Sequence, residues 1–156
     1  YAKSDNYLRD YLTNVFYQDA FSSTDISKIS GRNLTESDLY PLKNSGSARV
    51  VLSDQKVFAP TYNDMLSYSF KSNPDYDDAR LKSPTDFAIA NYTYIYIEAR
   101  YTTIDRVNGG TGYYFLCSSG SSSAIAFSVN FDGGVSAFSG VLDTYDGVCP
   151  ALLFNL

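Results

Sequence analysis

The chain contains no histidine and no tryptophan, and it has only one methionine and two cysteines among its 156 residues. Histidine is the side chain that most often transfers protons near neutral pH, so its absence argues against ordinary acid–base catalysis. The lack of histidine, together with the lack of a third cysteine, also argues against a zinc-type metal site. We therefore expect a protein that is not an enzyme and that carries no metal or other cofactor.

Basic side chains are few and scattered. The 12 Lys and Arg residues are outnumbered by 17 Asp and Glu residues, which gives a net charge of −5. Nucleic-acid binding requires clustered Lys and Arg that neutralise phosphates, so we expect no nucleic-acid partner. No apolar run approaches the roughly 18–20 residues that cross a bilayer, so we also expect no direct membrane insertion.

Tyrosine is abundant, with 15 Tyr beside 10 Phe. A chain rich in Tyr, Ser, Asn and Asp resembles secreted and cell-surface proteins, in which Tyr provides a broad contact area with a polar tip. Alternatively, the tyrosines fill strand positions, where aromatic side chains pack well. The length suits one domain with its own core, and we expect a single domain over residues 1–156.

The two cysteines, Cys117 and Cys149, each lie in a short apolar run bounded by Gly, Ser or Pro. Because both runs resemble neighbouring strands, we predict a disulfide between them, which would stabilise the fold by roughly 3–4 kcal/mol. Two free buried thiols are the alternative. The disulfide would place the chain in an oxidising compartment, and we expect an extracellular or cell-surface location.

Helical patterns dominate the first half of the chain. Apolar side chains recur every three or four residues from Tyr7 to Phe16, which predicts an amphipathic helix. Residues 21–29 predict a second short helix, capped by Ser22 or Ser23.

Two further helices are indicated by their caps. Thr61 and Asp64 have the spacing of a capping box, which predicts a helix that runs through Phe70. Ser83 and Pro84 predict the start of another short helix. Among the other segments of the first half, we expect a loop at 31–47, a strand at 48–52, a short extended piece at 56–59 and a turn at 71–75.

The hydrophobic period changes to two after residue 91, as in strands. We expect strands at 92–97, 113–116, 124–130, 135–138 and 148–154, a turn at 107–112, a polar loop at 118–123 and a hairpin turn at Asp132 and Gly133. Helices followed by antiparallel strands define an α+β fold, with the N-terminal helices packed on a C-terminal antiparallel sheet.

Asp75, Asp77 and Asp78 form the densest acidic cluster. Their oxygens could bind Ca²⁺ or act as a hydrolase dyad, but a solvated acidic turn explains them more simply. A tight turn likewise explains Asp132 and Gly133 better than a calcium loop does.

Six short segments occur in a familiar order: YLRDYL at 7–12, FYQDAF at 16–21, RLKSPTDFA at 80–88, FLCSSG at 115–120, VNFDG at 129–133 and GVCPAL at 147–152. In this order they resemble a family of uncharacterised bacterial extracellular domains with a C-type-lectin-like core. The last segment is also similar to formylglycine-generating enzymes, which use the same broad fold; that similarity concerns the fold and not the chemistry. The resemblance implies a C-type-lectin-like fold. Cys117 and Cys149 stand where the family pattern carries Arg, which fits two residues in contact.

In C-type-lectin-like folds, the loops after residue 100 of this chain would carry the ligand face. The aromatic residues that flank these loops are Tyr101, Tyr113, Tyr114, Phe138 and Tyr145. We expect them to stack on sugars or to contact a partner protein, unless about half of them belong to the core. The predicted function is a non-catalytic extracellular recognition module that binds a glycan or protein ligand through its C-terminal loops. The alternative is a structural subunit of a surface filament or appendage, which would self-associate through the same aromatic faces.

Overall fold

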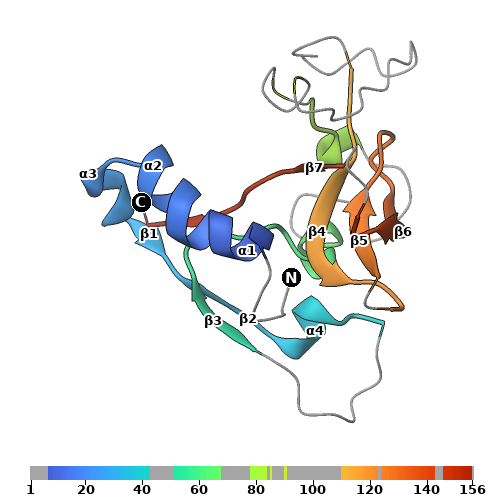
Figure 1. Ribbon diagram of the computed structural model, residues 1–156, viewed down its shortest axis with the longest axis horizontal. Coiled ribbons are helices and arrows are strands. Elements are labelled where there is room, and N and C mark those ends of the chain that lie inside the picture. The colour runs from blue at the N-terminus through green and yellow to red at the C-terminus, as the bar shows by residue number, and fades with distance from the viewer. Residues whose placement is uncertain are drawn as a thin grey trace.

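The computed structural model describes residues 7–42, 51–67, 78–83, 85, 90, 110–122, 124–142 and 146–155. These residues form a mixed fold in which most helices precede the strands, and the strands pair mainly in antiparallel fashion (Figure 1). The predicted α+β class is therefore confirmed. In the described part of the chain, no helix is long and apolar enough to cross a membrane.

One continuous helix begins the described chain. It consists of three consecutive segments, α1 (Tyr7–Tyr11), the π-helical η1 (Leu12–Phe16) and α2 (Tyr17–Ala20). Leu12 is buried while Tyr7 is 84% exposed, so the helix has the buried and exposed faces that its hydrophobic spacing predicts.

The short helix α3 (Ser23–Ile26) follows. Ser22 caps it, because the Ser22 hydroxyl accepts a hydrogen bond of 3.2 Å from the backbone N–H of Asp25. The predicted second helix is thus present, although it ends at Ile26 and, after a turn at residues 27–28, the strand β1 begins at Ile29.

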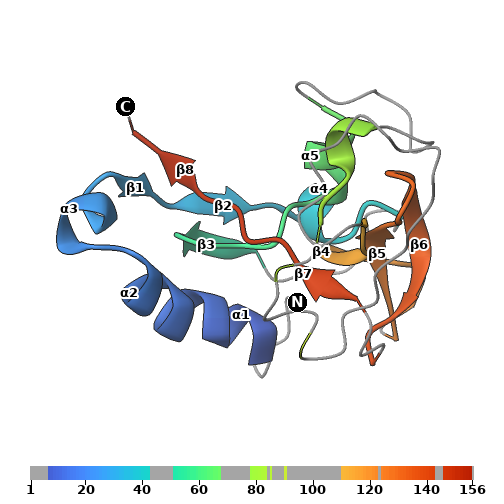
Figure 2. The same cartoon turned by 90° about the horizontal axis from the view of Figure 1, so that it is seen from above.

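Two small sheets connect distant parts of the sequence. In the first, β1 (Ile29–Ser30) pairs antiparallel with β8 (Leu153–Phe154). In the second, β2 (Arg32–Leu34) pairs antiparallel with β3 (Leu52–Gln55). Figure 2 shows β8 beside β1, so the end of the chain returns to the N-terminal helices.

The predicted loop at 31–47 is wrong over its first part, because this segment contains β2 and the helix α4 (Glu36–Leu39). Asp38 accepts a hydrogen bond of 2.8 Å from the Thr35 backbone N–H and so caps α4. The polar composition suggested a loop, but pairing with β3 and this cap order the segment. The predicted strand at 48–52 meets the described strand β3 only at Leu52.

The largest sheet has the order β6 (Val135–Gly140), β5 (Ile125–Val129), β4 (Tyr114–Ser119) and β7 (Gly147–Val148). Its pairs are antiparallel except for β4 and β7, which run parallel. The hairpin between β5 and β6 is confirmed: the Asn130 N–H donates to the Gly134 carbonyl at 2.8 Å, and Gly133 has a φ of 80°.

The predicted strand at 148–154 is wrong as a single element. The chain leaves β4 after Val148 and joins a different sheet at Leu153. Pro150 lies at the break and has no N–H for a strand ladder. Beyond it, Ala151 exchanges backbone hydrogen bonds of 3.0 and 2.8 Å with Phe58. The short extended piece expected at 56–59 thus contributes one isolated bridge, at Phe58.

The capping box predicted at Thr61 and Asp64 is confirmed at the start of α5 (Tyr62–Met65). The Thr61 N–H donates to the Asp64 carboxylate at 2.8 Å, and the Asp64 N–H donates to the Thr61 hydroxyl at 3.0 Å. The helix ends sooner than expected, at Met65; residues 68–70 lie outside the described chain.

The helices that pack most closely on β4 are α4 and α5, of which α5 is the helix predicted from Thr61. Strand β4 separates two clusters of buried side chains. One contains Leu34, Leu39, Leu52, Phe58, Ala59 and Cys117, and the other contains Met65, Tyr114, Leu116, Phe127 and Val129. Side chains alternate between the two faces of a strand, and this places Leu116 and Cys117 in different clusters.

Several predictions concern residues beyond the described ones. These are the turn at 71–75 with Asp75 and Asp77, most of the helix after Ser83, the strand at 92–97 and most of the turn at 107–112. Asp78 begins the short helix η2 (Asp78–Arg80).

Candidate functional site

Of the five aromatic residues predicted to bind a ligand, the structure describes the side chains of Tyr113 and Tyr114. Tyr101 and Tyr145 lie outside the described residues, and Phe138 lies in β6 with its side chain not described. The structure therefore brings two of the five candidates together, at the beginning of β4.

The two tyrosines differ in their surroundings. Tyr113 is partly exposed, and its ring meets the Phe131 ring edge-on at a centroid distance of 5.6 Å. Tyr114 is only 5% exposed, and its hydroxyl donates to the Arg80 carbonyl at 2.8 Å. Burial raises the pKa of Tyr114, and the negative charge that Cys149 carries when it is ionised adds to this effect. Tyr114 is thus a core residue that supports a site, and Tyr113 offers the more accessible ring.

Both tyrosines line a cavity of about 230 Å³ where β4 and β7 begin, together with Lys82, Cys149 and Pro150. A second cavity of about 420 Å³ shares Lys82, Tyr114, Cys149 and Pro150 with the first. Its remaining walls are formed mainly by apolar side chains, among them Phe58, Pro60, Met65, Ala151 and Leu153. We call the two adjoining cavities the Cys149 groove.

The predicted disulfide is not formed, because Cys117 and Cys149 are both free thiols. The two segments do lie side by side as expected, since Tyr114 is in register with Gly147 and Phe115 with Val148. However, Cys149 packs against the cluster that contains Leu116, whereas Cys117 belongs to the opposite cluster. Strand alternation therefore directs the two thiols to opposite sides of β4.

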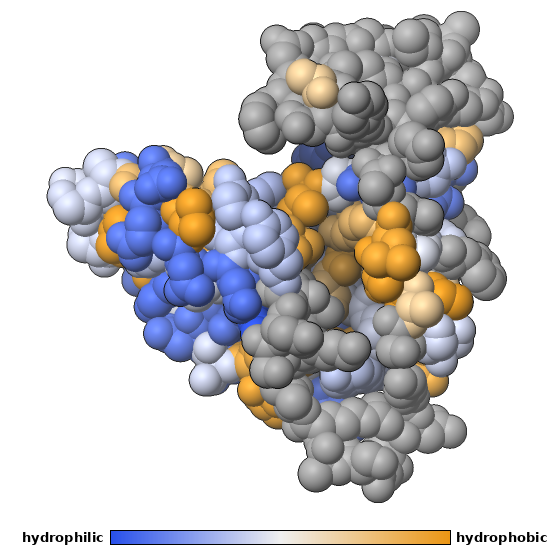
Figure 3. All heavy atoms as spheres, in the orientation of Figure 1, coloured by the Kyte–Doolittle hydropathy of each residue, from blue (hydrophilic) through white to orange (hydrophobic). Residues whose placement is uncertain are grey.

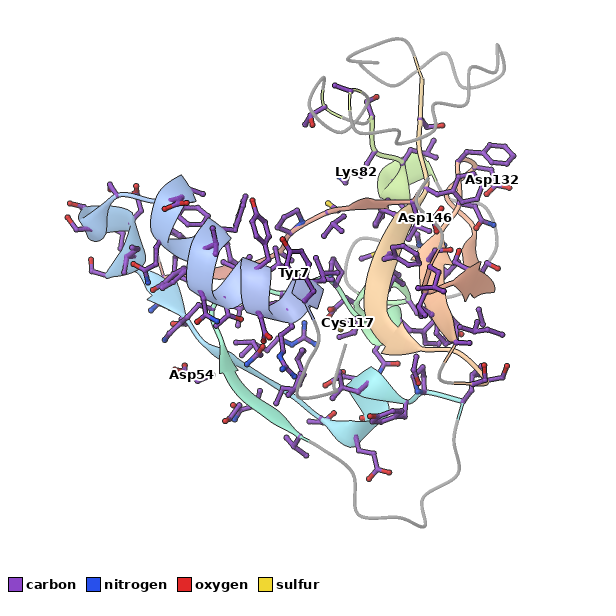
Figure 4. All side chains as sticks on the ribbon, in the orientation of Figure 1. Tyr7, Asp54, Lys82, Cys117, Asp132 and Asp146 are labelled. Atoms are coloured by element: carbon purple, nitrogen blue, oxygen red, sulfur yellow. The ribbon has the colours of Figure 1, made fainter. Side chains whose placement is uncertain are left out.

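Figure 4 shows Lys82, which lines the groove, near the beginning of β4, and Cys117 farther along the strand. Burial raises the pKa of Cys149, and the positive charge of Lys82 offsets part of this effect. Burial also raises the pKa of Cys117. Both thiols are therefore protonated near neutral pH, and Cys149 is not an activated nucleophile.

Arg32 also lines the groove, although no sequence pattern indicates a site at this residue. Its guanidinium contacts both oxygens of Asp64, at 2.9 and 2.7 Å, and reaches Asp38 at 3.6 Å. It also lies over the Phe58 ring, 5.1 Å from the centroid. Burial alone would lower the pKa of Arg32, but hydrogen bonding and the charge of Asp64 outweigh it and raise the pKa.

Arg80 is the second residue that the sequence did not single out. Its side chain is 0% exposed, and it donates to the carbonyls of Met65 at 2.8 Å and Gly133 at 3.2 Å. The Tyr114 hydroxyl also donates to the Arg80 backbone carbonyl, so Arg80 joins α5, the β5–β6 hairpin and β4. This buried network positions the wall of the groove that Tyr114 provides.

In the described residues, no group of three or more His, Cys, Asp or Glu side chains is arranged to hold a metal ion. The carboxylate of Asp132 accepts a hydrogen bond of 2.9 Å from the Gly134 N–H, as in a turn. The calcium and dyad alternatives for the cluster at Asp75 and Asp77 stay predictions.

Comparisons of the chain with protein-family models, with curated proteins and with solved structures found no match. The site must therefore be interpreted from its own geometry. That geometry consists of an apolar groove with Lys82 lining both cavities, an ion pair between Arg32 and Asp64 in one wall, and the protonated thiol of Cys149.

Proposed function

We propose that the chain is a non-catalytic recognition module of the cell surface, with C-type-lectin-like architecture, which binds a protein ligand in the Cys149 groove. One observation carries the proposal: two cavities of about 230 and 420 Å³ adjoin along residues 149 and 150. Sites of this size with mostly apolar walls and a few polar groups are typical of specific recognition.

The groove favours a protein ligand over a glycan. Its apolar walls suit the side chains of an extended peptide, and Lys82 offers an ammonium group to an acidic side chain or a chain end. A sugar would need more hydrogen-bonding groups than these walls provide. A glycan is thus the less favoured ligand for the groove, although its binding would also be a recognition function.

The extracellular location rests on the Tyr-rich composition and on the order of motifs that resembles bacterial extracellular domains. The free thiols no longer contribute to that argument. The C-type-lectin-like architecture rests on the same motifs together with the observed sequence of helices and strands.

The test begins with selection of ligands from a random peptide phage library and from a glycan array, the latter with and without Ca²⁺. Val148→Asp then places a charge at a groove residue that is 39% exposed. We expect about a tenfold or greater loss of affinity for the selected peptides. Val141→Asp is the matched control, because Val141 is similarly exposed, at 49%, and does not line the groove. Equal affinity in both variants, or selection of glycans alone, would contradict a peptide site here.

Self-assembly as a structural subunit is the second candidate, favoured by exposed apolar and aromatic side chains. On the N-terminal helix, Tyr7 stacks on Tyr11 and Tyr11 approaches Phe16, each with centroids 6.5 Å apart. Figure 3 shows hydrophobic side chains gathered in the hollow between this helix and the sheet, where Leu8 and Val148 line a further cavity of about 280 Å³. Sedimentation velocity over a range of concentrations tests this candidate: growth into polymers or rings supports it, and a stable monomer contradicts it.

A further inference from the structure

A separate cavity of about 510 Å³ lies between α4 and the start of α5, and its character differs from that of the groove. Figure 2 shows these two short helices together at one side of the four-stranded sheet. We call this cavity the Tyr40–Tyr62 bowl, and its walls include Glu36, Ser37, Tyr40, Pro41, Tyr62 and Asn63. Its volume lies within the roughly 300–1,000 Å³ of typical small-molecule sites.

The two tyrosines of the bowl are held in place by the protein core. Tyr40 packs against the cluster that contains Leu39 and Phe58. Tyr62 packs against the other cluster, with its ring centroid 4.5 Å from that of Phe127. Because both side chains are already packed against the core, a ligand that contacts them would lose little affinity to side-chain ordering.

Polar groups lie between these tyrosines. The Asn63 amide nitrogen makes long hydrogen bonds, of 3.3 Å to the Ser37 carbonyl and 3.4 Å to Asp38. Its amide oxygen accepts no hydrogen bond from the described residues. The Thr35 hydroxyl donates to Asp38 at 2.7 Å, so the Ser37 hydroxyl is the donor in its 2.9 Å contact with Thr35. The lone pairs of Ser37 and the amide of Asn63 are thus suited to ligand hydroxyl groups.

The walls of the bowl are connected beneath it. The Ser118 hydroxyl, which is buried in β4, donates to the Asp38 carbonyl and accepts a hydrogen bond of 2.9 Å from the Tyr62 N–H. Arg32 binds the carboxylates of Asp38 and Asp64, one from each helix. The spacing between the two walls is therefore set by the fold before any ligand arrives.

We propose that the Tyr40–Tyr62 bowl binds a neutral sugar ring. A pyranose has apolar C–H faces that suit the tyrosine rings, and hydroxyl groups that suit Asn63, Ser37 and the Glu36 carboxylate. Among the described residues that line the bowl there is a carboxylate and no Lys or Arg, so phosphorylated, sulfated and uronic-acid sugars are disfavoured. This inference goes beyond the recognition function proposed above, because it concerns a different site and a different class of ligand.

The experiment uses methyl glycosides of glucose, galactose, mannose and N-acetylglucosamine, together with maltotriose, in saturation-transfer NMR and in titrations. We expect at least one of these probes to bind, and Asn63→Ala and Tyr40→Ala each to weaken that binding about tenfold. Asn14→Ala and Tyr7→Ala are the matched controls, since both residues are exposed on the N-terminal helix, and they should leave the affinity unchanged. Asn63 is exposed, so its variant tests the proposal even if Tyr40→Ala fails to fold.

Three results would overturn the inference: no binding of any neutral probe, unchanged affinity in Asn63→Ala, or tighter binding of glucuronic acid than of glucose. Val148→Asp should leave sugar binding intact while it reduces peptide binding in the groove. The experiment therefore tests the proposed sugar site in the bowl independently of the proposed peptide site in the groove.

Discussion

The Cys149 groove and the Tyr40–Tyr62 bowl share β4 and Arg32, yet they are built in different ways. The groove brings together Lys82, Tyr114 and Cys149, which are distant in sequence, and its walls are largely apolar. The bowl is made by two four-residue helices, each capped by a Thr and an Asp three positions later, and its walls carry more polar groups. The comparison shows that local caps can shape one site while long-range packing shapes the other, and that Arg32, β4 and α5 link them.

Removal of the shared Arg32 should have the largest effect. Arg32→Met leaves Asp38 and Asp64 without their common cation in a partly buried site, and we expect it to reduce the free energy of unfolding by about 3 kcal/mol. Urea denaturation measures this change. The control is Lys56→Met, which removes an ion pair of 3.0 Å to the exposed Asp54, with an expected effect under about 0.5 kcal/mol. Equal effects in both variants would mean that Arg32 does not link the two regions.

Alkaline pH should reveal the two free thiols on opposite sides of β4. An unfolded thiol ionises near pH 8.5, but burial raises the pKa of Cys117 in the folded chain. The protonated Cys117 thiol therefore contributes its full stabilisation of the fold below pH 8.5, and this stabilisation is lost as the pH rises. Between pH 8.5 and 10 we expect a loss of about 2 kcal/mol, measured by urea denaturation.

The Cys117→Ala variant should show a shallower decline over the same pH range, while Gln18→Ala should behave like the unmodified chain. A disulfide cannot titrate, so mass spectrometry of unreduced protein provides a second check. Detection of a Cys117–Cys149 bond would contradict the arrangement described above.

Ser118→Ala should separate the bowl from the groove. The variant removes the donor to Asp38 and the acceptor for the Tyr62 N–H, at an expected cost of about 1–2 kcal/mol. We expect sugar affinity to fall because the walls of the bowl are no longer connected, whereas peptide affinity stays the same. Parallel titrations with both ligands measure the difference, and equal losses at the two sites would show that they are not independent.

Protonation of Asp38 should give the smallest effect. Burial alone would raise the pKa of Asp38, but hydrogen bonds from Thr35 and Asn63 and the charge of Arg32 outweigh it and lower the pKa. The ionised carboxylate therefore stabilises the fold above about pH 3.9 and loses this effect as the pH falls further. Asp38→Asn should cost about 1 kcal/mol at pH 7 and much less at pH 3, as measured by thermal or urea unfolding. A cost independent of pH would argue against a role for the charge.

Caps and turns were the parts of the fold that sequence reasoning predicted best. Thr61 with Asp64, Ser22 before α3, and the Asp132–Gly133 hairpin depend on contacts between residues a few positions apart. The helix α4 could have been found in the same way, because Thr35 and Asp38 repeat the spacing of Thr61 and Asp64. The polar composition of the segment concealed that signal.

The candidate sites were predicted less completely. Tyr113 and Tyr114 do line a cavity, but nothing in their neighbouring residues shows that Tyr114 is oriented into the core by Arg80. The contacts of Arg32 span 32 positions to Asp64 and cannot be inferred from local pattern. The prediction that the two cysteines lie in adjacent segments was correct, and the prediction of a disulfide between them was wrong.

By itself, the sequence determined the α+β class, the positions of the capped helices and the main hairpin, because these follow from hydrophobic period and from contacts within one turn. The tertiary structure alone decided which face of β4 each cysteine occupies, where the last segment leaves the sheet, and which side chains surround the groove and the bowl. Those outcomes depend on strand order and on the break at Pro150, so they are set by packing between segments far apart in the chain.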